Sequence, residues 1–176
     1  MIIIELLNKL TKGLAEKGID YMLTGSIALN HYSIPRMTLD IDMVIDLGEK
    51  NLADFLSILG SDYYFNEVTI KDEVSRRGMF NVIDYKTGFK IDFIIRKESE
   101  YKKLEFSRRI RSVISDFEVW IVSPEDLIIA KIEWVQELGS EKQIQDIKNL
   151  LVIPDLDIDY IRNWCKKLDL KTYNLI

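Results

Sequence analysis

The sequence is poor in the residue types that build many common active sites. It contains one cysteine, Cys165, and one histidine, His31, among 176 residues. A single cysteine excludes an internal disulfide and a cysteine-based zinc site. A single histidine excludes a histidine-rich metal site and disfavours a Ser-His-Asp triad. Any acid–base or metal chemistry is therefore expected from carboxylates, lysine, tyrosine or arginine.

Proline, glycine and long apolar runs are also scarce. Three prolines and eight glycines exclude a fibrous or low-complexity protein. No apolar run approaches the roughly 18 to 20 residues that a membrane span needs. The apolar N-terminal stretch lacks the basic start and the small-residue cleavage site of a secretory signal. We therefore expect a cytoplasmic protein without a membrane partner.

Positive charge is not in excess over the chain as a whole. The net charge of −5 argues against a protein that coats nucleic acid over one entire face. Residues 96–111 are the exception, with seven basic and three acidic side chains. This segment indicates either a site for a phosphate-bearing partner or a solvated helix face whose charges are paired with neighbours.

What the chain does contain is strong apolar periodicity, with 47% hydrophobic residues to build a core. Spacings of three and four predict helices, and alternation or short apolar runs predict strands. Ser26 and Ser123 precede two of the helices and are expected to cap them. The predicted helices cover 2–17, 26–34, 49–60, 123–138, 140–152 and 157–168, and the predicted strands cover 20–24, 38–46, 79–85, 89–95 and 119–123. In 38–46 the alternation predicts that Leu39, Ile41, Met43 and Ile45 face the core.

Three aspartates fall inside predicted strands. Asp40 and Asp42 lie two residues apart, so their side chains share one face, and Asp92 is central in a later strand. Aspartate has low β propensity, and burying its charge without a partner is costly. A divalent cation would offset that cost, and Mg²⁺ prefers carboxylate oxygens. We therefore expect these three carboxylates to converge on one magnesium ion, with phosphoryl-transfer chemistry as the consequence.

A Gly-Ser pair adds a candidate phosphate site. Gly25 follows a predicted strand and Ser26 opens a predicted helix, with thirteen residues between Ser26 and Asp40. Unpaired backbone N–H groups at a helix start attract anions, and glycine allows an anion to approach the backbone. By itself this pair is more often a simple turn and cap. Its order with the strand aspartates makes the combination more specific.

These motifs resemble the polymerase-β-like nucleotidyltransferase superfamily. The segments "LTGSIALNHY", "PRMTLDIDMVI" and "FKIDFII" are similar to its three core strands. Two later segments, "SPEDLIIAK" and "EKQIQDIKNLL", resemble the branch that contains nucleotidyltransferase toxins of type IV toxin–antitoxin (abortive infection) systems. That branch has an acidic residue followed, after four residues, by a lysine, and Asp126 and Lys131 match this spacing. A basic residue upstream of an aspartate is matched by Lys142 and Asp146.

The resemblance implies a fold and a division of the chain. The expected fold class is α/β (α+β), a nucleotidyltransferase-like mixed β-sheet flanked by helices with a helical C-terminal portion. Residues 1–122 would form the core, and residues 123–176 a helical portion packed on it as one compact unit.

The resemblance also implies roles for individual residues. Gly25 and Ser26 would hold the phosphates of an NTP, and Asp40 and Asp42 would bind Mg²⁺. Asp92 would bind the metal too and act as general base. The resemblance further implies that Lys131 contacts the triphosphate or offsets charge in the transition state, and that Asp146 orients this lysine.

Arg36 has two interpretations from the sequence. Its guanidinium, between Ser26 and Asp40, is expected either to bind a phosphate or to pair with Asp40 or Asp42. The function expected from all these residues is Mg²⁺-dependent transfer of an NMP from an NTP to a hydroxyl of RNA (such as tRNA), protein or a small molecule. A toxin-like role, with an antitoxin protein as partner, is one form of it. One alternative is a non-catalytic module that keeps the fold and binds a nucleotide or a partner protein. A third interpretation is a structural protein whose strand aspartates pair with arginine or lysine, which explains the charges but not their order with Gly25 and Ser26.

Overall fold

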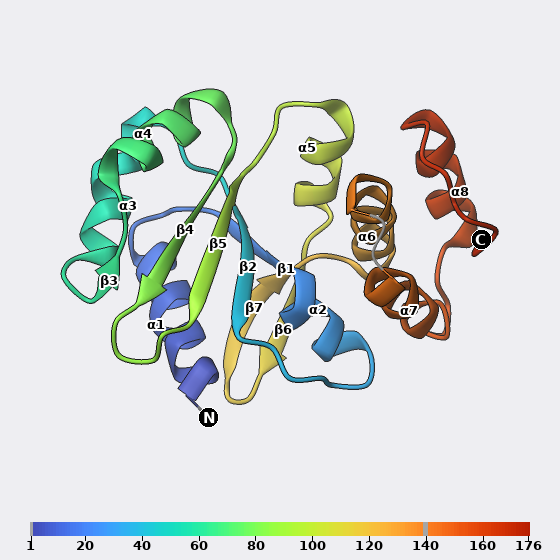
Figure 1. The fold of residues 1–176 in the computed structure, drawn as a ribbon, viewed down its shortest axis with the longest axis horizontal. Coiled ribbons are helices and arrows are strands. Elements are labelled where there is room, and N and C mark those ends of the chain that lie inside the picture. Colours follow the sequence, from blue (N-terminus) through green and yellow to red (C-terminus); the bar gives the residue numbers. More distant parts are fainter. Residues whose placement is uncertain (1, 139–140) are drawn as a thin grey trace.

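A mixed β-sheet organises the computed structural model, which describes residues 2–138 and 141–176 (Figure 1). In this part of the chain the sheet has seven strands in the order β3-β4-β5-β2-β1-β7-β6. The strands are β1 (Tyr21–Thr24), β2 (Asp40–Ile45), β3 (Tyr63–Tyr64), β4 (Met79–Asp84), β5 (Lys90–Ile95), β6 (Ile110–Ile114) and β7 (Phe117–Ile121). The helices are α1 (Ile2–Glu16), α2 (Gly25–Tyr32), α3 (Leu52–Leu59), α4 (Glu67–Arg76), α5 (Glu100–Ser107), α6 (Pro124–Leu138), α7 (Glu141–Leu150) and α8 (Ile158–Lys167), with a short 3₁₀ turn, Glu49–Asn51, before α3. This arrangement confirms the expected fold class.

The centre of the sheet joins three strands that carry the motifs. Strand β2 pairs antiparallel with β1, with Thr24 opposite Asp42. It pairs parallel with β5, with Asp42 opposite Asp92 and Asp40 opposite Lys90. Paired residues of neighbouring strands project to the same side of a sheet. One face of the central strands therefore collects the charged motif residues.

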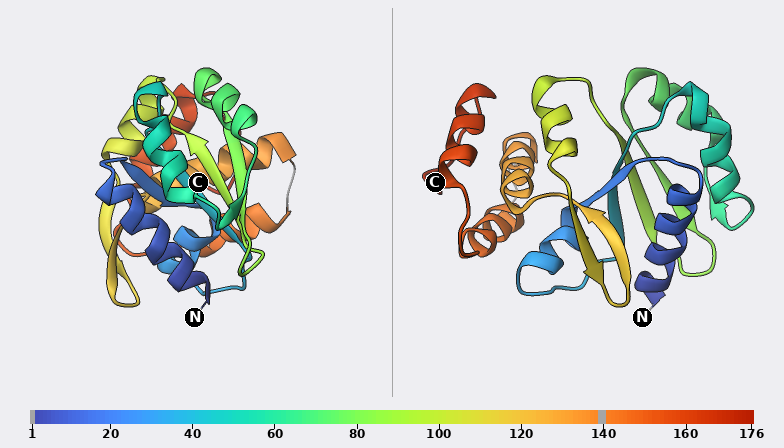
Figure 2. Two further views of the ribbon diagram at one scale, coloured as in Figure 1. Left: turned by 90° about the vertical axis from the view of Figure 1, so that its left-hand side faces the viewer. Right: turned by 180° about the vertical axis from the view of Figure 1, so that it is seen from behind.

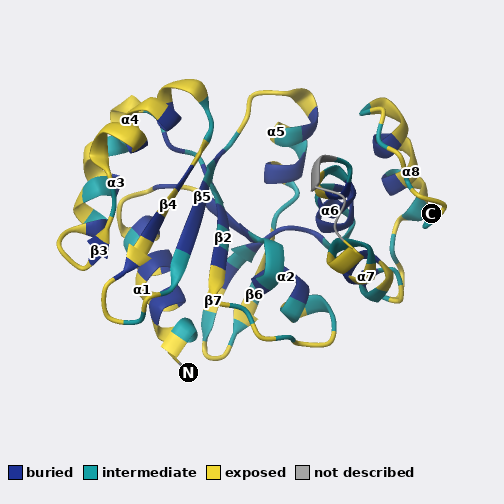
Figure 3. Ribbon diagram, in the orientation of Figure 1, coloured by how far each residue is buried: buried dark blue, intermediate teal, exposed yellow. Residues whose placement is uncertain are grey.

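The other face of the sheet is apolar and buried. In β2, Ile41, Met43 and Ile45 are buried as the alternation predicted, and Figure 3 shows this burial along the central strands. Phe55 of α3 packs edge-on against Phe80 of β4 and Phe93 of β5. The expectation for Leu39 was wrong, because it precedes β2 and is 63% exposed.

The C-terminal helices lie together on one side of the molecule. Figures 1 and 2 show α6, α7 and α8 stacked beyond α5, away from α3 and α4. Their positions match the predicted helices 123–138, 140–152 and 157–168 within one or two residues. Residue 140, the predicted start of the second of these helices, lies outside the described residues. The boundary at 122/123 between a core and a helical portion stays a prediction.

Two helix caps show where local sequence succeeds and where it fails. Ser123 Oγ accepts a hydrogen bond from Asp126 N at 3.2 Å, which confirms Ser123 as a cap of α6. The prediction for Ser26 was wrong, because Thr24 holds the N-cap position and α2 already begins at Gly25. Gly25 has φ +58°, so the strand turns directly into the helix without a linking residue.

Three elements were not predicted from the sequence, β3, α4 and β6, and α5 was expected only under one interpretation of residues 96–111. Helix α4 buries only Ile70, Glu73 and Val74, too few apolar positions for a clear stripe. Strand β6 is the last strand of the sheet, and none of its residues is buried. Short or exposed elements of this kind are held by their neighbours and leave little periodicity in the sequence.

Most charges of residues 96–111 are neutralised within the protein. Arg96 pairs with Glu98, Lys103 pairs with Glu98, and Arg109 pairs with Asp20, all at 2.8–3.0 Å. Of the two interpretations, the structure supports a charged segment paired with its neighbours. Among the described helices, none is both long and apolar enough to cross a membrane.

A buried carboxylate joins the last helices to the rest of the fold. Asp126 on α6 is fully buried. Its Oδ1 accepts hydrogen bonds from the hydroxyls of Tyr101 at 3.1 Å and Tyr160 at 2.7 Å. Its Oδ2 accepts from Ser123 Oγ at 2.7 Å and Arg108 Nε at 3.1 Å. Because Tyr101 is on α5 and Tyr160 on α8, one carboxylate links three helices.

The substitution Asp126→Ala should destabilise the protein strongly. It would leave two tyrosine hydroxyls, a serine hydroxyl and the Arg108 guanidinium without their acceptor, and breaking such a buried group typically costs about 3–5 kcal/mol. Urea unfolding of the variant measures the loss. Glu118→Ala is the control, because Glu118 is 68% exposed in its pair with Arg111 and should change stability by less than about 1 kcal/mol. Equal losses in the two variants would contradict this account of Asp126.

Candidate active site

The site begins where Asp42 meets the start of α2. The Ser26 N–H donates to Asp42 Oδ2 at 3.4 Å, so the carboxylate satisfies one of the free donors of the helix start. A Cβ placed on Gly25 would overlap the Asp42 carboxylate. The residue at position 25 must therefore be glycine for two reasons: its positive φ and this close approach.

The three aspartates lie at one edge of the same sheet face. Asp42 and Asp92 are direct neighbours across β2 and β5, whose strands are about 4.8 Å apart. Asp40 lies two residues before Asp42 and is opposite Lys90. Asp92 is 9% exposed, whereas Asp40 is exposed to solvent. The topology thus brings together the three residues that the sequence singled out.

The carboxylates do not converge as expected on one ion-sized point. Among the described residues, no three histidine, cysteine, aspartate or glutamate side chains are grouped so that they could hold a metal ion. The physical reason is Lys90, whose Nζ donates to Asp92 Oδ2 at 2.7 Å and lies 4.0 Å from Asp40 Oδ1. Two of the three carboxylates therefore face an ammonium group of the same protein.

The electrostatics still favour a further cation at this edge. Burial raises the pKa of Asp42, the hydrogen bond from Ser26 opposes this, and repulsion by Asp92 and Asp40 raises the pKa further. The hydrogen bond to Asp92 raises the pKa of Lys90, which stays charged. Lys90 thus forms ion pairs with two of the three carboxylates, and Asp42 has no ion-pair partner among the described residues. The all-oxygen donors of the three carboxylates and their mutual repulsion fit a hard cation such as Mg²⁺.

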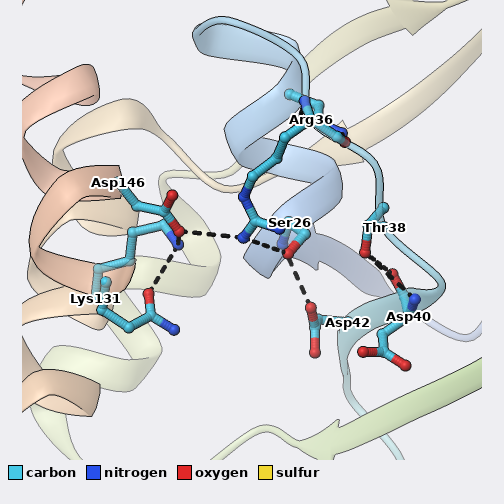
Figure 4. Close-up of polar contacts among 9 residues, drawn as sticks. Ser26, Arg36, Thr38, Asp40, Asp42, Lys131 and Asp146 are labelled. Carbon is cyan, nitrogen blue, oxygen red and sulfur yellow. Dashed lines mark hydrogen bonds and ion pairs between the residues drawn. The ribbon is translucent and has the colours of Figure 1, made fainter. Parts of the chain in front are cut away.

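A cationic cluster lies on the other side of Ser26. Arg36 Nη2 donates to Ser26 Oγ at 3.0 Å and to Asp146 Oδ2 at 3.2 Å. Lys131 Nζ donates to the same oxygen of Asp146 at 2.8 Å. Figure 4 shows Arg36 reaching between Ser26 and Asp146, with Asp42 beyond Ser26. Asp146 therefore positions two cations beside the start of α2.

These two cations are poorly neutralised. Lys131 is 4% exposed, and burial lowers its pKa, with Asp146 opposing the shift and Arg36 adding to it. The Nε–H of Arg36 is buried, and within the described residues it has no hydrogen-bond partner. The backbone of Arg36 is fixed by Asn30, whose side chain bonds both Arg36 N and O at 2.9 and 2.7 Å. A fixed guanidinium with an unused buried donor fits an anion.

The second interpretation of Arg36 was wrong about its partner. Arg36 pairs with Asp146 on α7, and neither Asp40 nor Asp42 is within ion-pair distance of it. The reason is that the loop after α2 directs this side chain toward α6 and α7 rather than toward β2.

Sequence reasoning missed three residues of the site. Lys90 could have been found from the sequence, because it is two residues before Asp92 and so lies on the same face of the strand. No sequence pattern indicated the other two residues. Asn30 fixes Arg36, and Gln143 accepts a hydrogen bond from Lys131 Nζ at 3.0 Å. Their contacts arise only when α2, α6 and α7 pack together.

Of the four residues that match the motifs of the C-terminal helices, two lie at the site and two lie elsewhere. Lys131 and Asp146 are in contact, and the roles that the resemblance implies for them stay predictions. Asp126, in contrast, is the buried link between helices, and Lys142 is exposed to solvent.

Comparison with known proteins agrees with this arrangement. The model of the family described as "Nucleotidyltransferase of unknown function (DUF6036)" matches residues 1–174. No curated protein matches the chain.

Several solved structures share the fold at low sequence identity. The solution structure of the antibiotic-resistance factor ANT(2'')-Ia has a TM-score of 0.65 and 14% identity, covering 96% of this chain and 91% of that chain. A crystal structure of ANT(2'')-Ia with adenylyl-2''-tobramycin has a TM-score of 0.61 and 13% identity, covering 96% and 98%. The lincosamide antibiotic adenylyltransferase LnuA, bound to lincomycin, has a TM-score of 0.53 and 13% identity, covering 86% and 95%. At this identity the likeness establishes the fold.

The substitution Gly25→Ala should displace Asp42 as well as strain the backbone. A residue with a side chain at positive φ costs roughly 1–2 kcal/mol, and here the new methyl group also overlaps the Asp42 carboxylate. Gly18→Ala is the matched control, because Gly18 has φ +63° and no atom lies within 4 Å of the place where its new methyl group would sit. Urea unfolding should show a larger loss for position 25, and NMR should show a shifted Ser26 amide signal in that variant alone. Identical losses and an unshifted amide would refute the role given to Gly25.

The substitution Asp42→Asn should stabilise the protein at neutral pH. An unfolded aspartate has a pKa near 3.9, and the folded pKa of Asp42 is higher. The folded state therefore binds the proton more tightly, and the free energy of unfolding falls as the pH rises from about 4 through the folded pKa. The asparagine variant lacks this fall. Urea unfolding between about pH 4 and pH 8, in buffer with a metal chelator, should show a growing advantage of the variant, whereas parallel pH profiles would contradict the assignment.

Proposed function

Because the chain belongs to the nucleotidyltransferase family DUF6036, we propose that it transfers an NMP from an NTP to an acceptor hydroxyl with the help of Mg²⁺. The observation that carries this proposal is the position of Ser26 between a carboxylate and a guanidinium group. One side of this residue holds an Asp42 carboxylate and the other holds the Arg36 guanidinium. A cation site and an anion site therefore meet at a single helix start, as a metal-bound polyphosphate requires.

The residues beside α2 would bind the polyphosphate of the NTP. Gly25 leaves the backbone accessible, and Ser26 supplies its hydroxyl, because its N–H already donates to Asp42. Arg36 supplies its unused Nε–H, and Lys131 supplies a buried positive charge. Asp146 would keep these two cations in position while the pyrophosphate leaves.

Asp40, Asp42 and Asp92 would hold Mg²⁺. The ion would neutralise charge on the phosphates and orient them for in-line attack. Lys90 holds Asp92 through Oδ2, so Oδ1 of Asp92 is the oxygen available to accept a proton from the acceptor hydroxyl. The ammonium of Lys90 must separate from Asp92 or from Asp40 when these carboxylates bind the ion.

The acceptor is proposed as a hydroxyl of RNA, protein or a small molecule. ANT(2'')-Ia with an adenylylated tobramycin and LnuA with lincomycin support testing a small molecule first. The toxin-like role, the antitoxin partner and the cytoplasmic location remain predictions from the resemblance and the composition. The non-catalytic alternative predicts nucleotide binding without transfer.

Transfer should depend on both β2 aspartates. The protein is incubated with α-labelled NTPs and Mg²⁺, together with total RNA, tobramycin or lincomycin in separate reactions. Replacing Asp40 and Asp42 by asparagine should reduce label transfer by roughly 10²-fold or more, because a catalytic metal is worth several kcal/mol in the transition state. Asp116→Asn, in the exposed turn between β6 and β7, is the control.

Two results would count against this proposal. Equal transfer by the wild type and the double variant would remove the assigned metal site. NTP binding by the wild type without transfer to any acceptor would support the non-catalytic module.

A further inference from the structure

A cleft of about 260 Å³ lies on the same sheet face as the three aspartates. Its floor is formed by Val44 of β2, Ile94 of β5 and Met79 of β4. Helices α5 and α6 form its walls, and the residues from α6 are Ala130, Glu133 and Trp134. None of the site residues described above lines this cleft, so the proposed chemistry does not yet use it.

The strand register makes the cleft continuous with the carboxylates. Val44 follows Asp42 by two residues, and Ile94 follows Asp92 by two residues on the neighbouring parallel strand. At about 3.3 Å per residue, the floor begins roughly 7 Å beyond the carboxylates. Thr24, which directly precedes Gly25, lines the same cleft. A molecule whose phosphate lies at the carboxylates can therefore extend into this space.

The charges around the cleft are mostly paired with each other. Lys102 lies 3.3 Å from Glu105 and 2.9 Å from Glu133. The surface that remains open to a ligand is mostly apolar, with Met79 46% exposed and Trp134 39% exposed, and it also includes the exposed Lys97. Such a surface suits a flat, weakly polar group and offers no free carboxylate for a polycation.

Trp134 differs from the other two tryptophans. Arg109 and Arg111 lie over the Trp120 ring, and Lys167 lies over the Trp164 ring. Within the described residues, Trp134 has neither a ring nor a cation stacked on it. It is a half-exposed aromatic face at the wall of a mostly apolar cleft beside the proposed phosphate-binding site.

We propose that this cleft is a base-binding subsite in which a nucleobase stacks on Trp134. The proposal rests on the proposed function, because the phosphate attached to that nucleoside would lie at the carboxylates. Stacking on an indole suits any nucleobase, since every base presents a π-face. The base belongs either to the NTP itself or to a nucleoside of the acceptor, and both present the same chemistry to the cleft.

Equilibrium binding tests the proposal without any transfer step. Dissociation constants are measured for ATP, CTP and inorganic tripolyphosphate with the wild type, Trp134→Leu and Trp134→Phe. Leucine keeps an apolar side chain but removes the stacking face, whereas phenylalanine keeps a ring. If the NTP base occupies the cleft, NTPs bind the wild type roughly 5- to 150-fold more tightly than tripolyphosphate. Trp134→Leu should remove most of this difference, Trp134→Phe should retain most of it, and tripolyphosphate should bind all three proteins alike.

A second arm identifies an acceptor base. The three proteins are saturated with tripolyphosphate and titrated with AMP and a short oligonucleotide. The base comes from the acceptor if two results are found together. NTPs bind no more tightly than tripolyphosphate, and AMP and the oligonucleotide bind most tightly to the wild type, less tightly to Trp134→Phe and least tightly to Trp134→Leu. The proposal would be overturned if every nucleotide had the same dissociation constant for Trp134→Leu as for Trp134→Phe. Because turnover is not measured, this failure is distinct from a lack of nucleotidyl transfer.

Discussion

The close approach of the Asp42 carboxylate to the start of α2 is the contact on which the site depends. It requires that β1 pass into α2 without a linking residue, and only glycine at position 25 allows both the backbone angle and the space. Once this contact is made, the free donors of the helix lie beside the carboxylates of β2 and β5. Ser26 then links these carboxylates to Arg36, and through Arg36 to Asp146 and α7.

The charged groups of this protein fall into two contrasting sets. Asp126 is buried with four hydrogen-bond donors around it, so its charge is fully satisfied and it stabilises the packing of α5, α6 and α8. The site is the opposite case. Burial and repulsion raise the pKa of Asp42, burial lowers the pKa of Lys131, and Arg36 retains an unused donor. Unbalanced groups of this kind cost stability and are typical of sites that bind charged ligands.

Lys90 has a particular place between these two sets. Its ammonium lies among the carboxylates that are proposed to hold a metal ion, and it neutralises part of their repulsion. Asp92 is paired with this ammonium group although Asp42 is its direct neighbour on β2. Metal binding and Lys90 are thus expected to oppose each other, because both offer positive charge to the same oxygens.

The sequence by itself determined the elements and the candidate residues that carry a strong local pattern. The apolar spacing of α1, the alternation of β2, the apolar runs of β4 and β5 and the Ser123 cap follow from periodicity and capping chemistry, which act over a few residues. Only the tertiary structure decided which charges meet. Asp146 lies 110 residues from Arg36 in the chain. Lys90 is likewise distant from Asp40 in the sequence, and the two are neighbours only because β5 pairs with β2. The cause is that ion pairs and clefts form between elements, and their positions depend on how the sheet and helices pack rather than on any local spacing.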